Sequence, residues 1–191
     1  MKDFTLVRKP TRSKNIDYSK PGAYFVTICT QDRKHLLSRI ENDIVFCGED
    51  EPKSEEAGAA SYSPTSAEKF IVNSPKLCLT EVGEVIERQL LGVGERFHNI
   101  RIDEYVIMPN HIHLIIFIEE CENFTSHSLN DVVRVFKSLA SRECKAKFQI
   151  GGLFQRSYYD HFIKDKADYS KIARYIRDNP KTWFYDRYYN K

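Results

Sequence analysis

The sequence has no long apolar segment and no cysteine pattern of the kind that builds a zinc ribbon or a disulfide framework. The longest nearly uninterrupted apolar run, Leu114 to Ile118, is far too short to cross a bilayer. No apolar stretch follows the basic N-terminus, as a secretory signal would require. The five cysteines are odd in number and never spaced as C-x-x-C. We therefore expect a cytoplasmic protein with no membrane partner.

The chain also lacks an overall excess of charge, but its charges are unevenly distributed. The net charge is only +2. Residues 1–47 carry 9 Lys and Arg against 5 Asp and Glu, residues 48–130 carry 6 against 15, and residues 131–191 carry 14 against 7. Two basic ends therefore enclose an acidic middle. This distribution favours a polyanionic partner, although solvated surface charge is the ordinary alternative.

The length of 191 residues predicts a single domain. Residues 48–69 are acidic, small and polar, and we interpret them as a flexible insertion too poor in apolar residues to form a core. Residues 181–191 form a basic, aromatic tail. The sequence contains no G-x-x-x-x-G-K-[ST] loop for nucleotide phosphates, so no ATP-driven step is expected.

Hydrophobic periodicity predicts an alternation of strands and helices. The expected order is strand, helix, strand, strand, helix, strand and helix, over residues 23–30, 81–93, 100–107, 111–118, 129–145, 154–164 and 167–178. Thr80 and Ser128 are the expected N-caps of the first two helices. The first six elements match a ferredoxin-like, split βαβ arrangement of the α+β class. Its free sheet face would accept a ligand or the added C-terminal helix.

Two histidines in one expected strand are the first candidates for a metal site. His111 and His113 project to the same face because side chains alternate along a strand, whereas Ile112 takes the opposite, core face. Adjacent imidazoles on a strand can bind a divalent metal. Two ordinary surface or packing histidines remain the alternative.

The last expected helix adds a second pair of candidates. Tyr175 and Asn179 are four residues apart and therefore share one helical face. An asparagine oxygen is a suitable ligand for Mg²⁺ or Mn²⁺, and a tyrosine hydroxyl beside a metal can act as a nucleophile. The ordinary alternative is that Tyr175 packs beside Ile172 and Ile176 while Asn179 ends the helix.

Four segments together resemble the HUH single-tyrosine transposases, and the match is closest to the REP-associated tyrosine transposases. Their order along the chain is that of the family, from residue 22 to residue 180. They are Gly22-Ala-Tyr-Phe-Val-Thr-Ile-Cys-Thr30, Tyr105-Val-Ile-Met-Pro-Asn-His-Ile-His-Leu114, Phe154-Gln-Arg-Ser-Tyr-Tyr-Asp-His-Phe-Ile-Lys164 and Tyr175-Ile-Arg-Asp-Asn-Pro180. Phe154 and Lys164 depart from the tryptophan and arginine common in the family, and the insertion at 48–69 is unusually long.

The resemblance implies a role for each matching residue. Tyr175 would be the nucleophile, and His111, His113 and Asn179 would hold Mg or Mn. The implied activity is cleavage and rejoining of single-stranded DNA near imperfect hairpins through a 5′-phosphotyrosine. The implied assembly is either a monomer or a homodimer. The alternative function is a domesticated DNA-hairpin-binding protein with little or no cleavage activity.

Basic side chains on or beside the polar face of the helix expected over 129–145, together with Arg156, are the expected DNA contacts. The candidates are Arg134, Lys137, Arg142, Lys145 and Arg156. The tail aromatics could stack on unpaired bases or pack as a hydrophobic flap. His161 is a candidate third histidine for the metal, but a structural or DNA-contacting role is favoured for it. Tyr158 and Tyr159 are rival nucleophiles.

Overall fold

The computed structural model describes residues 20–41, 44–45, 71–72, 75–120 and 127–189. The expected acidic insertion at 48–69 and the residues before 20 lie outside the described residues. Within the described part, no helix is long and apolar enough to cross a membrane.

A four-stranded antiparallel sheet forms the centre of the molecule. Its strands are β1 (Gly22–Cys29), β6 (Ile100–Ile107), β7 (His111–Ile118) and β8 (Tyr159–Ile163). They lie in the order β6-β7-β1-β8, and every neighbouring pair is antiparallel. With a helix after the first and third strands of this sheet, this is the expected ferredoxin-like arrangement.

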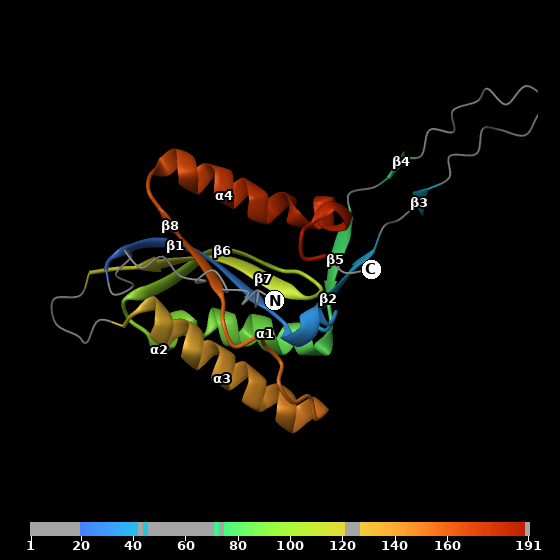
Figure 1. Cartoon of the computed structure of the whole chain (residues 1–191), viewed down its shortest axis with the longest axis horizontal. Coiled ribbons are helices and arrows are strands. Elements are labelled where there is room, and N and C mark those ends of the chain that lie inside the picture. Colours follow the sequence, from blue (N-terminus) through green and yellow to red (C-terminus); the bar gives the residue numbers. More distant parts are fainter. Residues whose placement is uncertain (1–19, 42–43, 46–70, 73–74, 121–126, 190–191) are drawn as a thin grey trace, which may run out of the picture.

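Helices cover both faces of the sheet (Figure 1). One face carries α1 (Glu81–Leu91), α2 (Val93–Arg96) and α3 (Leu129–Phe148). The opposite face carries α4 (Lys166–Asp178), which continues into the 3₁₀ helix η2 (Asn179–Tyr185). The face left free by the split βαβ unit is therefore covered by the added C-terminal helix.

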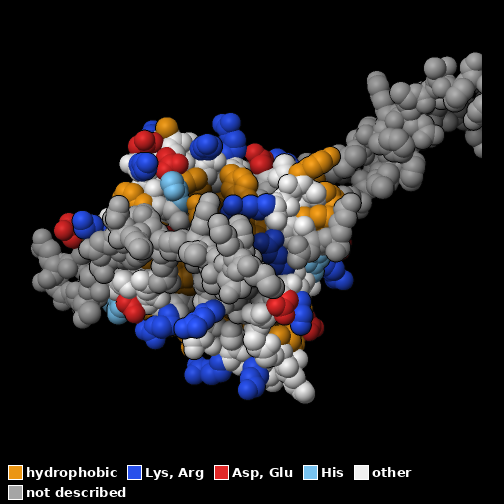
Figure 2. All heavy atoms as spheres, viewed as in Figure 1, with side chains coloured by type: hydrophobic (Ala, Val, Ile, Leu, Met, Phe, Trp, Pro, Cys, Tyr) orange, Lys and Arg blue, Asp and Glu red, His pale blue; other side chains and the backbone are white. Residues whose placement is uncertain are grey.

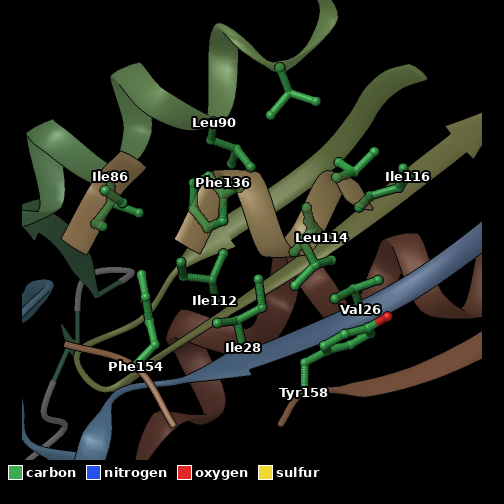
Figure 3. Close-up of a cluster of buried hydrophobic side chains, with 14 of the residues drawn as sticks. Val26, Ile28, Ile86, Leu90, Ile112, Leu114, Ile116, Phe136, Phe154 and Tyr158 are labelled. Atoms are coloured by element: carbon green, nitrogen blue, oxygen red, sulfur yellow. The ribbon is translucent and has the colours of Figure 1, made fainter. Parts of the chain in front are cut away.

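Alternation along β1 and β7 divides their side chains between two hydrophobic cores. Val26, Ile28, Ile112 and Leu114 point toward α1 and α3 and lie in the larger core (Figure 3). On the other face, Phe25 of β1 and Ile115 of β7 pack with α4 in the smaller core. The expected core face of β7 is confirmed.

Both expected N-caps are present. The Thr80 hydroxyl accepts a hydrogen bond from the Gly83 amide at 3.1 Å. Ser128 accepts from the Asp131 amide at 3.3 Å, and the Asp131 side chain accepts from the Ser128 amide at 3.4 Å. This is a capping box in which aspartate replaces the more usual glutamate.

Two parts of the fold differ from the sequence-based expectation. The strand expected over 154–164 is shorter, because Phe154 pairs only with Thr30 and the ladder begins at Tyr159. The carbonyl oxygens of residues 155–157 bond instead to the ammonium of Lys137. The structure also contains short antiparallel pairs that were not expected, β2 (Ser38–Glu41) with β5 (Lys76–Leu79) and β3 (Ile44–Val45) with β4 (Ile71–Val72).

Gly83→Ala should destabilise the protein, because a Cβ at this position would lie 2.0 Å from the Leu37 carbonyl oxygen. The loss should be about 2 kcal/mol or more, since α1 must move away from the 36–37 backbone. Gly94→Ala is the matched control, because its nearest neighbour would lie at 3.6 Å. Urea unfolding measures both; equal stability of the two variants would contradict this packing argument.

Candidate metal and nucleophile site

The imidazoles of His111 and His113 lie side by side on β7, fully buried beneath α4 and the tail. Their Nε2 atoms are 3.1 Å apart. Nδ1 of His111 is 2.9 Å from Asn110 Oδ1, and Nδ1 of His113 is 2.8 Å from Thr27 Oγ1. The expectation that both rings share a face is confirmed, and each ring is held from its Nδ1 side.

The surroundings of Asn110 fix the tautomer of His111. The Asn110 amide nitrogen donates to the carbonyl oxygens of Arg33 at 3.3 Å and Tyr188 at 2.7 Å, which sets the orientation of the amide. Its Oδ1 can only accept a hydrogen bond, so His111 Nδ1 carries a proton and donates. A neutral His111 therefore presents the lone pair of Nε2 to His113.

Burial keeps both imidazoles neutral. It lowers the pKa of His111 to about 4; the charge of Asp186 opposes this shift, and the charges of Arg33 and Arg187 add to it. Burial also places the pKa of His113 well below its ordinary value, and the neighbouring His111 adds to this effect. Two neutral, buried imidazoles with facing Nε2 atoms are suited to binding a cation between them.

Tyr175 of α4 brings its hydroxyl to the same place. The oxygen lies 3.2 Å from Nε2 of His113 and 3.3 Å from Oδ2 of Asp186. Burial, followed by the charge of Asp186, raises the pKa of Tyr175 to about 12. The residue as a whole is nevertheless 40% exposed. The nucleophile candidate and the histidine pair therefore meet within one chain.

Asn179 lies at the start of η2, one turn after Tyr175, and is fully buried. Its amide nitrogen donates to Asp186 Oδ2 at 2.9 Å. Its amide oxygen is buried without a hydrogen-bond partner among the described atoms. A buried, unpaired carbonyl-type oxygen is costly unless something binds it, so Asn179 has a free hard ligand atom.

Asp186 is the residue of the site that sequence reasoning missed. Atoms of His111, His113 and Asp186 that could bind a metal all lie within 4.8 Å of one another. Asp186 follows Asn179 by seven residues in a segment without periodicity, and no motif marks it. Its acidic character in a basic, aromatic tail is the one sequence signal that could have drawn attention to it.

The tail aromatics divide between the two expected roles. Trp183 and Tyr188 are buried, and their ring centroids lie 5.9 Å and 4.6 Å from that of His111. Phe184 and Tyr185 are exposed, Tyr185 by 92%. One part of the tail therefore closes over the histidines, and the other part is open to solvent.

The expected DNA contacts do not converge on the histidine pair. Arg134, Lys137, Arg142 and Lys145 belong to α3, on the opposite face of the sheet, where Lys and Arg side chains gather along the lower edge of the view (Figure 2). Arg134, Lys137 and Arg156 share the rim of a hollow of about 660 Å³. Lys137 is already bonded to carbonyl oxygens of residues 155–157, which gives it a structural role as well.

The remaining candidates have other surroundings than the histidine pair. His161 Nε2 bonds to Asp168 Oδ2 at 2.9 Å, consistent with the favoured structural role. The Tyr158 hydroxyl donates to Asn130 of α3 at 2.6 Å, on the face of the larger core. Tyr159 is 41% exposed on β8.

Comparison with known proteins identifies the family. The model of the IS200-like transposases matches residues 75–179, more than half of the chain and including all four proposed site residues. The chain belongs to this family. The resemblance inferred from the four motifs is thereby confirmed, and the protein is a transposase of the single-tyrosine class, whose members act on single-stranded DNA.

Individual relatives agree with this assignment. A Haemophilus influenzae protein of uncharacterized function is 28% identical and covers 95% of this chain and 93% of its own. A second H. influenzae protein, described as a REP-associated tyrosine transposase, is 26% identical over 86% of this chain and 73% of its own. A solved REP-associated tyrosine transposase bound to a REP hairpin shares the fold, with a TM-score of 0.57, 16% identity and coverage of 92% and 76%.

The depressed histidine pKa values predict that this transposase loses stability in mild acid. Unfolded His111 would take up a proton near pH 6.5, whereas folded His111 resists protonation down to about pH 4. Stability is therefore complete above pH 6.5 and is lost as the pH falls, by about 2 kcal/mol for this residue between pH 7 and pH 5. Urea unfolding in the presence of EDTA should show a smaller loss in His111→Gln. An identical pH dependence would rule out the buried neutral imidazole.

Proposed function

We propose that this transposase cleaves and rejoins single-stranded DNA next to hairpins, with Tyr175 as nucleophile and a divalent metal, Mg or Mn, as cofactor. The observation that carries the proposal is the position of the Tyr175 hydroxyl, 3.2 Å from His113 Nε2 and 3.3 Å from Asp186 Oδ2. The family membership and the motif at residues 175–180 support the same assignment.

The donor set fits a hard or borderline divalent cation. His111 and His113 would contribute Nε2 atoms, Asn179 its unpaired amide oxygen and Asp186 a carboxylate oxygen. Nitrogen and oxygen ligands in this mixture suit Mn²⁺ and, with water, Mg²⁺. When bound, the cation would orient the phosphate and stabilise the negative charge that develops on its oxygens.

The covalent step exchanges one phosphoester bond for another. The Tyr175 oxygen attacks the phosphorus, the bond from phosphorus to the 3′ oxygen breaks, and the DNA is left with a free 3′-hydroxyl. The Tyr175 hydroxyl gives up its proton, for which Asp186 Oδ2 at 3.3 Å is the hydrogen-bond acceptor, and the departing 3′ oxygen takes up a proton from water. A second 3′-hydroxyl can reverse the reaction without any other energy source.

A DNA hairpin is the proposed partner. Support comes from the fold shared with a transposase solved on a REP hairpin and from the basic side chains of α3 and Arg156. The site residues come from one chain, so a monomer suffices for the proposed chemistry, and a homodimer stays a prediction.

Tyr175→Phe should abolish covalent DNA attachment. Protein incubated with hairpin-flanked single-stranded DNA and Mn²⁺ should form an adduct that survives denaturing electrophoresis, and the phenylalanine variant should form none. Tyr185→Phe is the matched control, because this exposed tyrosine has no described partner at the site. An adduct from Tyr175→Phe would disprove the nucleophile; hairpin binding without any wild-type adduct would favour the domesticated alternative.

Asp186→Asn should weaken Mn²⁺ binding at least about tenfold, because it removes the carboxylate charge beside the histidines. Electron paramagnetic resonance of free Mn²⁺ measures the affinity without DNA or turnover. Asp178→Asn is the control: it removes an equal charge near the end of α4, from a residue paired with Lys181. Unchanged affinity in Asp186→Asn, together with a loss in His111→Gln, would exclude Asp186 as a ligand.

A further inference from the structure

A hollow of about 430 Å³ opens beside the histidine pair. Two residues of its wall also contact the histidines, and they show where the hollow lies. Thr27, which bonds to His113, forms part of its wall, and so does Tyr188, whose ring stacks near His111. The complete lining is Thr27, Cys29, Arg33, Gln155, Ser157, Tyr158, Tyr159, Arg187 and Tyr188.

Two guanidinium groups give this hollow a positive charge. The lining includes Arg33 and Arg187 but no aspartate or glutamate. Within the described part of the chain, neither arginine forms an ion pair, whereas Arg88, Arg101 and Arg177 each do. An anionic group would therefore find two donors that are not neutralised by a carboxylate.

Both arginines are fixed in place by contacts within the protein. Arg33 Nη1 donates to the Arg187 carbonyl oxygen at 3.0 Å, and Arg187 Nη2 donates to the Tyr188 hydroxyl at 2.6 Å. The two guanidiniums lie 5.0 Å and 4.7 Å from the centre of the Tyr188 ring. Ordering them before the ligand arrives reduces the entropy lost on binding.

The backbone at Arg33 is strained. Asp32 and Arg33 are consecutive non-glycine residues with φ of 55° and 53°. Each such residue raises the free energy of the folded chain, and the surrounding contacts must offset this cost. Strain of this kind is concentrated at functional sites. The turn is held by Asn110, which donates to the Arg33 carbonyl oxygen. The structure thus maintains an unfavourable turn that directs Arg33 to the hollow.

An exposed aromatic ring completes the surface. Tyr159 is 41% exposed, lines the hollow, and lies 5.6 Å from the Arg187 guanidinium. Exposed aromatic rings beside cationic groups are the common means of binding unpaired nucleotides, since the ring stacks on a base and the cation binds the phosphate.

We propose that this hollow binds one nucleotide of the single-stranded DNA next to the phosphate that Tyr175 attacks. Arg33 and Arg187 bind its phosphate, and Tyr159 stacks on its base. The proposal rests on the proposed function for its place beside the cleaved bond. It assigns recognition of the single strand to residues outside α3.

The test measures DNA binding without cleavage. Fluorescein-labelled (dT)12 is titrated with the full-length protein in EDTA, and affinity is followed by fluorescence anisotropy at several salt concentrations. Arg33→Gln and Arg187→Gln should each weaken binding about tenfold and reduce the salt dependence by about one phosphate contact. Arg96→Gln, an equal charge change on α2, should alter affinity less than twofold. Thermal unfolding verifies that each variant is folded.

Tyr159→Ala provides a second measurement that does not change charge. Loss of stacking should weaken (dT)12 binding about tenfold, whereas Leu91→Ala, at an exposed apolar residue of α1, should leave it within twofold. The proposal is wrong if the hollow variants bind like wild type, or if Arg96→Gln weakens binding as much as they do. Failure of the Tyr175 adduct with intact effects of Arg33 and Arg187 would overturn the cleavage reaction but not the binding site.

Discussion

The fully buried amide of Asn110 bonds to the neighbouring His111 and to two parts of the chain that are distant in sequence. Its oxygen accepts from His111, and its nitrogen donates to the carbonyl oxygens of Arg33 and Tyr188. The same group therefore sets the histidine tautomer, holds the strained turn after β1 and anchors the tail. A single buried amide can do this because an unpaired donor in the interior is costly, so all three partners must be present together.

The site depends on burying polar groups that would be more stable in water. Two imidazoles remain neutral beneath α4, and the oxygen of Asn179 has no partner among the described residues. The tail adds Asp186 close to the histidines, and the buried rings of Trp183 and Tyr188 lie against His111. The proposed cation would give these groups the partner that the described residues do not supply.

The charge distribution takes on a more definite meaning in three dimensions. The basic C-terminal third is divided between two faces of the sheet, with α3 on one face and Arg187 in the tail on the other. The proposed hairpin contacts and the proposed single-strand contacts thus line two neighbouring hollows that share Tyr158. Such a division suits a substrate that is folded in one part and unpaired in another.

The predictions from the sequence were correct where they rested on local periodicity. Alternation along residues 111–118 placed both histidines on one face, and helical spacing placed Tyr175 and Asn179 on another, because these relations follow from backbone geometry alone. The order of strands and both N-caps were also correct. The shortened strand before residue 159 could not be anticipated, since it depends on Lys137 capturing carbonyl oxygens from another element.

The sequence by itself determined the family, the sheet topology and the residues that could perform the chemistry. Only the tertiary structure decided that Tyr175 meets His113 within one chain, that Asp186 joins them, and that Arg33 and Arg187 face the same hollow. The reason is physical: turns and tails have no repeating geometry, so the positions of their side chains are set by long-range contacts such as those of Asn110.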